Sequence, residues 1–254
     1  MKRLILPLFF SASAFFVSNL TIADDFSTVE KKIKSAMEAD VRSEKEKMRD
    51  ANRKPIETLA FFGLRDDMKV VEFVPGGGWY TKILAPVLAE KGELILAFGT
   101  SRAEKNLLTQ PGFEKVKVTA KESSMSRPED SYFFDLDEKG FDVTKADMVL
   151  TFRNYHNFSD TSRKKMNETA YKALKKGGIY GVVDHTRRHM EPTSAENRRR
   201  VDPVLTIKEV QDAGFQLVDY TSLHYHPEDT LIYEVGNSEV TGKTDRYTLM
   251  FKKI

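Results

Sequence analysis

Cysteine is the one amino acid missing from this chain of 254 residues. Its absence excludes disulfide bonds, thiolate metal sites and the attachment of a lipid to an N-terminal cysteine. Long apolar runs are also scarce, because no segment after the first 23 residues is apolar for long enough to cross a bilayer. The fold must therefore be held by an ordinary hydrophobic core, which about 230 residues can supply.

An excess of charge of one sign is lacking as well. The formal net charge is +2, from 40 basic and 38 acidic residues. Lys2 and Arg3 account for this excess, so residues 24–254 carry 38 basic and 38 acidic residues. We therefore expect no nucleic-acid partner and no binding to an acidic membrane surface. The sequence leaves the oligomeric state open.

The first 23 residues have the order of a secretory signal peptide. Two basic residues come first, residues 4–17 are apolar, and small residues precede Asp24. We predict that Ala23 is the last residue removed, with an uncleaved inner-membrane anchor as the alternative. An exported chain without disulfides is typical of a bacterial periplasm, so we expect a periplasmic protein with no stable membrane insertion after cleavage.

The rest of the chain divides into an N-terminal extension, residues 24–52, and a domain over residues 53–254. The extension is polar, with apolar residues at helical spacing, and predicts one or two surface helices. In the domain we expect strands over 68–74, 93–98, 116–119, 147–152, 179–183, 215–220 and 247–252, and helices over 53–62, 79–90, 160–174 and 203–213. Short strands separated by helices predict a mostly parallel sheet with right-handed crossovers.

Three consecutive glycines, at 76–78, stand where the first strand of the domain ends and a helix begins. Ligands bind at this end of the strands in open α/β sheets. Glycine lets backbone N–H groups approach a ligand, and a helix N-terminus favours an anionic group such as a carboxylate. Glu72, at the end of the strand, can bind an ammonium group. The segment predicts a site for an amino-acid-like ligand; the alternative is a tight turn that binds nothing.

Several blocks of sequence carry a family resemblance. They are Arg53-Lys54-Pro55, Leu59-Ala60-Phe61-Phe62-Gly63-Leu64, Pro75-Gly76-Gly77-Gly78-Trp79-Tyr80-Thr81, Thr151-Phe152-Arg153-Asn154-Tyr155-His156 and Gly181-Val182-Val183-Asp184-His185, extended by Arg200-Val201-Asp202-Pro203 and Thr244-Asp245-Arg246-Tyr247. In these blocks the chain resembles the predicted class I S-adenosylmethionine-dependent methyltransferases that carry signal peptides in Gram-negative bacteria. The resemblance implies a Rossmann-like α/β fold, with a mostly parallel seven-stranded sheet, an antiparallel last strand and flanking helices.

The same resemblance implies S-adenosylmethionine as the cofactor. Its expected contacts are Glu72, Pro75, Gly76, Gly77, Gly78 and Tyr80 after the first strand, and Phe98, Gly99 and Thr100 after the second. The second strand departs from the class, because a typical methyltransferase has an acid at its end to hold the ribose hydroxyls. Thr100 or Ser101 can offer only neutral hydrogen bonds, which are weaker than those of a charged group. We therefore expect reduced cofactor affinity.

Polar residues directly follow the fourth and fifth strands, at the sheet edge where methyl donor and acceptor would meet. We predict that His156 or Tyr155 accepts the proton of the nucleophile and that His185 is a further catalytic candidate. Arg153 and Asn154 are expected to orient the substrate or the amino-acid end of the cofactor. The alternative for Tyr155 and Asn154 is that they only hold the loop together.

The five histidines do not predict a metal site, because none of their spacings matches a zinc motif. Arg187, Arg188 and the arginines at 198–200 are typical of a solvated loop and helix face, with binding of an anionic substrate as the alternative.

The leading hypothesis is an exported methyltransferase that acts on a small molecule or an envelope component. A catalytically inactive binding protein with the same fold is the alternative, favoured by the missing ribose acid and by the cytoplasmic origin of the cofactor. A third hypothesis, a metal-assisted hydrolase, needs His156, His185 and a carboxylate to converge. The sequence does not name the methyl acceptor.

Overall fold

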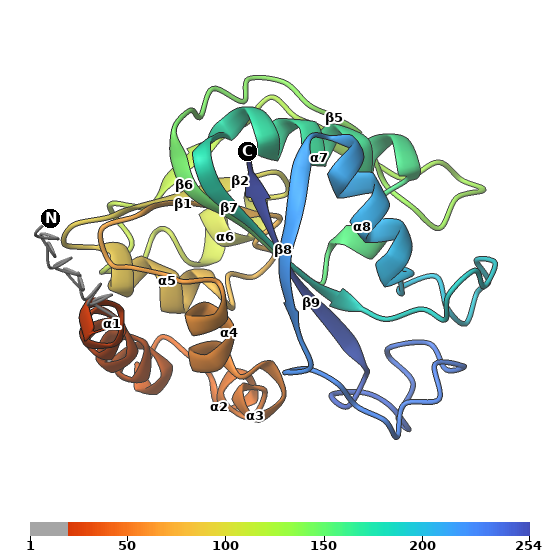
Figure 1. Ribbon diagram of the computed structural model, residues 1–254, viewed down its shortest axis with the longest axis horizontal. Helices are drawn as coiled ribbons and strands as arrows, with labels where there is room; N and C mark the ends of the chain where they lie inside the picture. Colours follow the sequence, from red (N-terminus) through yellow and green to blue (C-terminus); the bar gives the residue numbers. More distant parts are fainter. Residues whose placement is uncertain (1–19) are drawn as a thin grey trace, which may run out of the picture.

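A twisted sheet of seven strands organises the protein (Figure 1). The computed structural model describes residues 20–254, with side chains described from Phe26 onward, so most of the predicted signal peptide lies outside the described residues. In the sheet the strand order is β3 (Lys117–Thr119), β2 (Glu93–Ala97), β1 (Lys69–Phe73), β6 (Ala146–Phe152), β7 (Leu174–His185), β9 (Arg246–Lys253) and β8 (Phe215–Thr221). The first five are parallel, whereas β9 is antiparallel to both neighbours. This is the predicted sheet.

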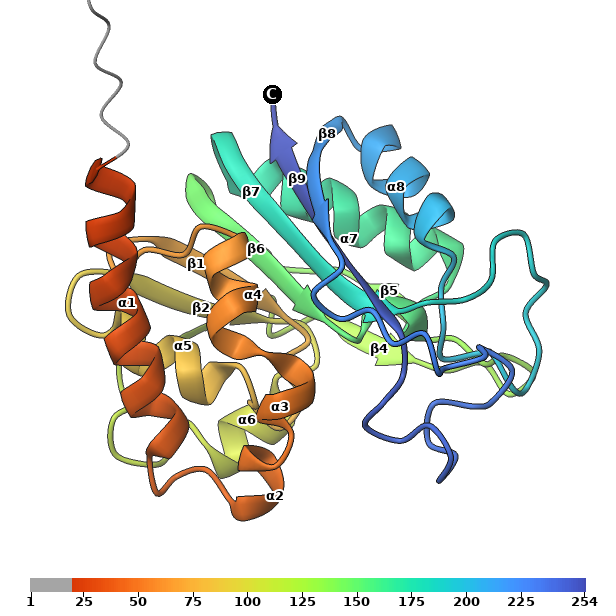
Figure 2. The ribbon, with the colours of Figure 1, turned by 60° about the horizontal axis from the view of Figure 1, so that its bottom comes forward.

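Helices cover both faces of the sheet. Figure 2 shows α1 (Leu20–Glu38), α4 (Pro55–Phe61) and α5 (Thr81–Leu88) on one face and α7 (Asp160–Ala173) and α8 (Pro203–Asp212) on the other. Successive side chains of a strand point to opposite faces, so Val70 packs with the first group and Val71 with the second. The smaller elements are α2 (Glu44–Lys47), α3 (Asp50–Arg53), α6 (Ser101–Asn106), the 3-10 turn Tyr155–Asn157, and an antiparallel ribbon of β4 (Ser124–Ser126) and β5 (Asp135–Asp137).

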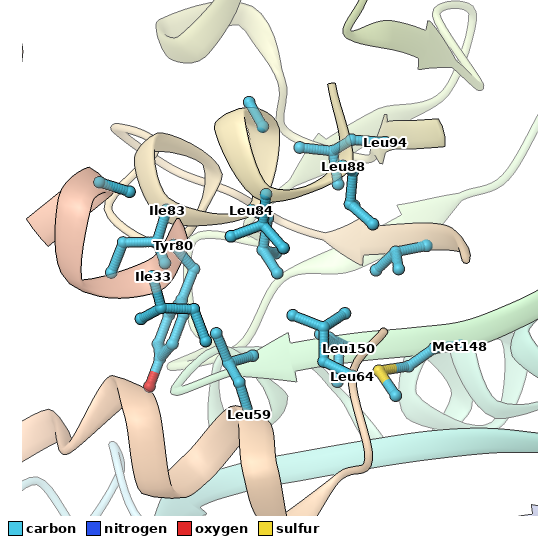
Figure 3. Packing of buried hydrophobic residues seen from close by; sticks show 14 of the residues in the cluster. Ile33, Leu59, Leu64, Tyr80, Ile83, Leu84, Leu88, Leu94, Met148 and Leu150 are labelled. Carbon is cyan, nitrogen blue, oxygen red and sulfur yellow. The ribbon is translucent and has the colours of Figure 1, made fainter. Parts of the chain in front are cut away.

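The N-terminal extension contributes to the core rather than lying only on its surface. Val29, Ile33 and Ala36 of α1 recur at helical spacing and are each 3% exposed or less. Figure 3 shows Ile33 and Leu59 among the side chains that fill the space over α5 and β6. The extension is thereby fixed against the sheet, and its last residues reach the carboxyl edge. Among the described residues, no helix combines the length and apolar character needed to span a membrane.

One strand is longer than expected. Gly177 and Gly178 do not separate helix from strand, because β7 already begins at Leu174, opposite a register shift between Ala146 and Met148. A Cβ at Gly178 would lie 2.9 Å from the Leu174 side chain and from the Lys175 carbonyl oxygen, so only glycine fits this close approach. The expected strand over 179–183 is therefore the second half of a longer one.

Candidate active site

The carboxyl ends of β1, β6 and β7 meet at one edge of the sheet. Because β9 runs the opposite way, its first residue, Arg246, pairs with His185 at the end of β7. Two cavities open at this edge. One of about 280 Å³ lies against the glycine turn, and one of about 510 Å³ lies over His156 and His185. Arg49, Arg53 and Arg153 line both cavities, so the two adjoin.

The glycine turn presents backbone amides to the smaller cavity. Pro75, Gly76 and Gly77 line it. A Cβ at Gly76 would meet nothing within 4 Å, and one at Gly77 would meet only the Arg102 side chain, at 3.6 Å. Within residues 20–254 the N–H groups of Gly76 and Gly77 make no hydrogen bond, whereas the N–H of Gly78 donates to the Pro75 carbonyl at 2.9 Å. Gly76 and Gly77 therefore face the open space, and Gly78 closes the turn.

Glu72 forms the floor of the same cavity. The residue is 3% exposed, and among the described residues its carboxyl accepts a single hydrogen bond, of 2.6 Å from the Thr81 hydroxyl. Burial raises the pKa of Glu72 to about 7, although the Thr81 hydrogen bond and the nearby Arg53 lower it. A ligand cation would favour the ionised form, so the carboxyl suits an ammonium group. Tyr80, which stacks on Phe152 at 3.6 Å between ring centroids, completes this wall.

The end of β2 is covered by the protein's own side chains. Phe98, Gly99 and Thr100 line neither cavity. Phe98 packs on Phe73, and a Cβ at Gly99 would come within 2.8 Å of the Met125 side chain. The three residues predicted to contact the cofactor at this strand end are therefore covered and do not line a cavity. The Thr100 hydroxyl donates to Glu104 at 2.6 Å, which brings to this strand end a carboxylate that sequence reasoning missed.

The sheet edge holds several non-glycine residues in the left-handed conformation. Val74, Phe98 and Arg153, each directly after a strand, have φ of 54°, 62° and 59°. A β-branched residue such as Val74 rarely adopts this conformation, which costs about 1–3 kcal/mol and clusters at functional sites. The surrounding sheet holds these residues in place, as the 2.7 Å hydrogen bond from the Arg153 N–H to the Val183 carbonyl shows.

Asp184 orients His156. The carboxylate accepts from the His156 backbone N–H at 3.0 Å and from the His185 N–H at 2.6 Å, and it lies 2.5 Å from His156 Nδ1. A carboxylate can only accept, so Nδ1 carries a hydrogen, and in the neutral ring the lone pair is then on Nε2. Within the described chain Nε2 has no hydrogen-bond partner, and His156 lines the larger cavity. The pair has the arrangement of an oriented general base.

His185 lies beside this pair, with its ring centroid 5.5 Å from that of His156. Burial, and then the positive charges of His156 in its protonated form and of Arg246, lower the pKa of His185 well below its usual value. The ring is therefore neutral, and its Nδ1 has no partner among the described residues. His185 also lines the larger cavity.

Two predicted residues do not present a reactive group to a cavity. The Tyr155 hydroxyl donates to Glu209 and accepts from Asn167, both at 2.8 Å, and the residue is completely buried beneath α7 and α8. The Asn154 side chain touches the smaller cavity, but its amide donates to the carbonyls of Val74 and Phe152 at 2.9 Å. Through these contacts both side chains connect the sheet edge to neighbouring segments.

Arginines from distant segments complete the site, and sequence reasoning gave them no role. Arg53 stacks on Trp79 with its guanidinium carbon 4.3 Å from the ring centroid. The Trp79 indole N–H donates to the Glu46 carbonyl at 3.0 Å, which fixes the segment carrying Arg49 and Arg53 against the glycine turn. Both Arg53 and Arg246 belong to the blocks that carry the family resemblance. That membership is the one feature of the sequence that could have pointed to them as site residues.

His156, His185 and the carboxylate of Asp184 do converge. Among the described residues, however, no group of three or more His, Asp or Glu side chains is arranged to hold a metal ion. Instead, both oxygens of Asp184 are occupied by N–H donors.

Comparisons with solved structures identify the fold. A S-adenosylmethionine-dependent methyltransferase from Aquifex aeolicus superposes with a TM-score of 0.55 at 15% identity, over 89% of this chain and 98% of that one. The [4+2]-cyclase SpnF superposes with a TM-score of 0.54 at 13% identity, over 91% of this chain and 94% of that one. Human N-acetylserotonin methyltransferase, in complex with S-adenosylmethionine, gives 0.51 at 12% identity, over 93% of this chain and 60% of that one. The chain thus has the Rossmann-like fold of class I methyltransferases.

Sequence comparisons add no closer relative. No protein-family model matches the chain, and no curated protein matches it. Because SpnF is a cyclase with this fold, the fold alone does not decide the reaction.

Proposed function

We propose that the protein is an S-adenosylmethionine-dependent methyltransferase that is exported to the periplasm and acts on a small molecule or an envelope component. One observation carries the proposal: Gly76 and Gly77, whose amides make no hydrogen bond within the described chain, line one cavity together with Glu72, and this cavity adjoins that of His156. Free amides suit a carboxylate and the carboxyl suits an ammonium group, so the pair fits an amino-acid end.

The residues present fit the amino-acid end of the cofactor better than its adenosyl end. Gly76, Gly77 and Glu72 would hold the amino-acid end, with Arg53 available for its carboxylate. The adenosyl end has no acid on β2 itself, and Glu104, held by Thr100, is the carboxylate we assign to the ribose hydroxyls. The cover of Met125 over Gly99 supports the expectation of reduced affinity.

When bound, the cofactor supplies a methyl group on a sulfonium, which is transferred in line to a nucleophile. The protein's part is to align the acceptor, exclude water and take a proton. His156 Nε2 receives the proton of the acceptor, and Asp184 stabilises the imidazolium that forms. His185, which stays neutral, limits the positive charge next to that imidazolium.

Calorimetric titration of S-adenosylmethionine into protein purified from the periplasm tests the proposal. We expect binding in the wild type and none in Gly77→Asp, which places a carboxylate where that of the ligand lies. Gly77→Ala is the matched control, because its Cβ contacts only Arg102, at an ordinary 3.6 Å, and the φ angle is not positive. Absence of binding at millimolar cofactor would refute the proposal, as would equal affinity in Gly77→Asp.

A binding protein without catalysis is the second candidate, and the covered end of β2 favours it. Transfer of labelled methyl to any periplasmic extract fraction by the wild type, lost in His156→Ala, distinguishes the enzyme from the binding protein. Export has its own test: cell fractionation with mass analysis, where we expect a periplasmic chain that starts at Asp24.

A further inference from the structure

The larger cavity is lined by charge of one sign. Six basic side chains face it and no carboxylate does: Lys45, Arg49, Arg53, Arg153, Arg199 and Arg246. The chain as a whole has nearly equal numbers of basic and acidic residues. The concentration of positive charge is therefore a property of this cavity and not of the composition.

Most of these charges have no acidic partner in the described part of the chain. Arg199 pairs with Glu234. Among the described residues, no carboxylate lies within ion-pair distance of Arg49, Arg53, Arg153 or Arg246. Arg53 and Arg246 are only 6% and 4% exposed, so water compensates their charges poorly. Buried charges are ordinarily paired, which makes this cluster an exception that needs a ligand.

The contacts of the cluster leave donors available. Arg53 rests on the Trp79 ring and makes no hydrogen bond through its guanidinium within the described chain. Arg246 donates to the Asn52 carbonyl at 2.7 Å through one nitrogen, while its Nε has no partner. Asp184, the acid that contacts His156, is already occupied by three N–H donors.

Electrostatics within the cluster are unfavourable without a ligand. Burial, and then the charge of Arg153, lowers the pKa of Arg53; burial, and then the charge of Arg246, lowers that of Arg153. A guanidinium nevertheless keeps its proton, so like charges stand close together in a poorly solvated place. An anion bound between them would remove this repulsion and satisfy the free donors.

We propose that the larger cavity binds a phosphate or diphosphate group, which makes the methyl acceptor of this enzyme a phosphorylated compound. This proposal rests on the proposed function in one respect, namely that the phosphorylated compound is the methyl acceptor. One carboxylate would leave most of the cluster uncompensated, whereas a phosphate carries about −1.5 to −2 charges and a diphosphate carries more. Planar guanidinium groups bind phosphate through two hydrogen bonds each. A volume of about 510 Å³ suits a small molecule or a headgroup.

Titration calorimetry with inorganic pyrophosphate, without S-adenosylmethionine, tests the anion site alone. We expect binding at low salt that weakens about tenfold or more in Arg49→Gln and in Arg153→Gln, since each removes a charged hydrogen-bond donor. Arg49 is exposed and makes no ion pair, so Arg49→Gln should fold normally; a thermal melt checks this. Arg65→Gln, which removes an exposed arginine paired with Asp67, is the control and should bind as the wild type does.

Two further arms locate and identify the anion. Arg102→Gln changes only the smaller cavity and should leave pyrophosphate binding intact. Sedimentation with phosphatidylserine-containing vesicles distinguishes a lipid headgroup, lost in Arg49→Gln, from a soluble phosphate, for which no vesicle binding is expected. The inference is overturned if the wild type does not bind pyrophosphate at millimolar concentration, if citrate binds equally well, or if Arg65→Gln or Arg102→Gln weakens binding as much as Arg49→Gln. None of these measurements uses S-adenosylmethionine. A failure of the protein to bind S-adenosylmethionine would therefore refute the proposed function without deciding whether the anion site exists.

Discussion

The ion pair of Arg200 and Asp229 should stabilise both the fold and the wall of the larger cavity. Both side chains are completely buried, and their two hydrogen bonds measure 2.8 and 3.0 Å. Arg200 also donates to the carbonyls of Tyr233 and Thr186, and Asp229 accepts from the Asp245 N–H. The pair therefore joins the loop 186–202, which follows β7, to the loop 222–245, which precedes β9.

Arg200→Met leaves the Asp229 carboxylate buried without its cation, which costs about 3–5 kcal/mol. Backbone N–H donors to Asp229 remain, so we expect the lower end, about 3 kcal/mol, or a fall in melting temperature of about 6–12 °C for a domain of this size. Urea and thermal unfolding measure the loss. Arg188→Gln, at an exposed position, should change stability by less than about 0.5 kcal/mol.

The double variant Arg200→Met/Asp229→Leu removes both charges and should recover much of the lost stability. Pyrophosphate binding should fall in Arg200→Met, because Gly236, Thr241 and Thr244 of the loop over the cavity lose their support. A loss below about 1 kcal/mol in Arg200→Met would show that the pair is not a structural anchor.

Four further outcomes follow from the site. His156→Ala should lower the rate of methyl transfer by about 10²–10⁴-fold while the Kd for S-adenosylmethionine stays the same; a matching rise in Kd would contradict its role as base. Cofactor affinity should rise as pH passes upward through about 7, because Glu72 must ionise to bind an ammonium group, and Glu72→Gln should remove that dependence in calorimetry. Burial lowers the pKa of His224 to about 4, so the folded state binds fewer protons than the unfolded state and stability falls as pH drops from about 6.5 to about 4; urea unfolding in His224→Gln should show a flatter profile. Pyrophosphate should tighten the binding of S-adenosylmethionine, whose sulfonium is cationic, and the reverse titration must give the same factor.

The central sheet could be predicted because its strands are short apolar runs bounded by turns. Each expected strand is present, and most ends agree within one or two residues, as for 93–98 against Glu93–Ala97. The elements that escaped, β4, β5 and α6, have three to six residues and no clear periodicity. The first half of β7 escaped for another reason: Gly178 permits a close approach to Leu174 and Lys175 that no local pattern reveals.

The site could be predicted only where strand order decides it. Residues at the carboxyl ends of parallel strands share one edge, which brings His156 to Asp184 and places Glu72 at the adjoining cavity. Strand order does not determine where a side chain points. Tyr155 is buried beneath α7, although its neighbour His156 lines the cavity. The convergence of Arg49, Arg53 and Arg246 on Arg153 could not be predicted because it joins segments far apart, as in the contact between Arg246 and Asn52 across 194 positions.

A crystal structure of the protein with S-adenosylhomocysteine would test the central claim most directly. The account predicts the ligand's carboxylate within hydrogen-bonding distance of the Gly76 or Gly77 amide and its ammonium group against Glu72. Density for the ligand elsewhere, or a glycine turn that makes no contact with its amino-acid end, would contradict it.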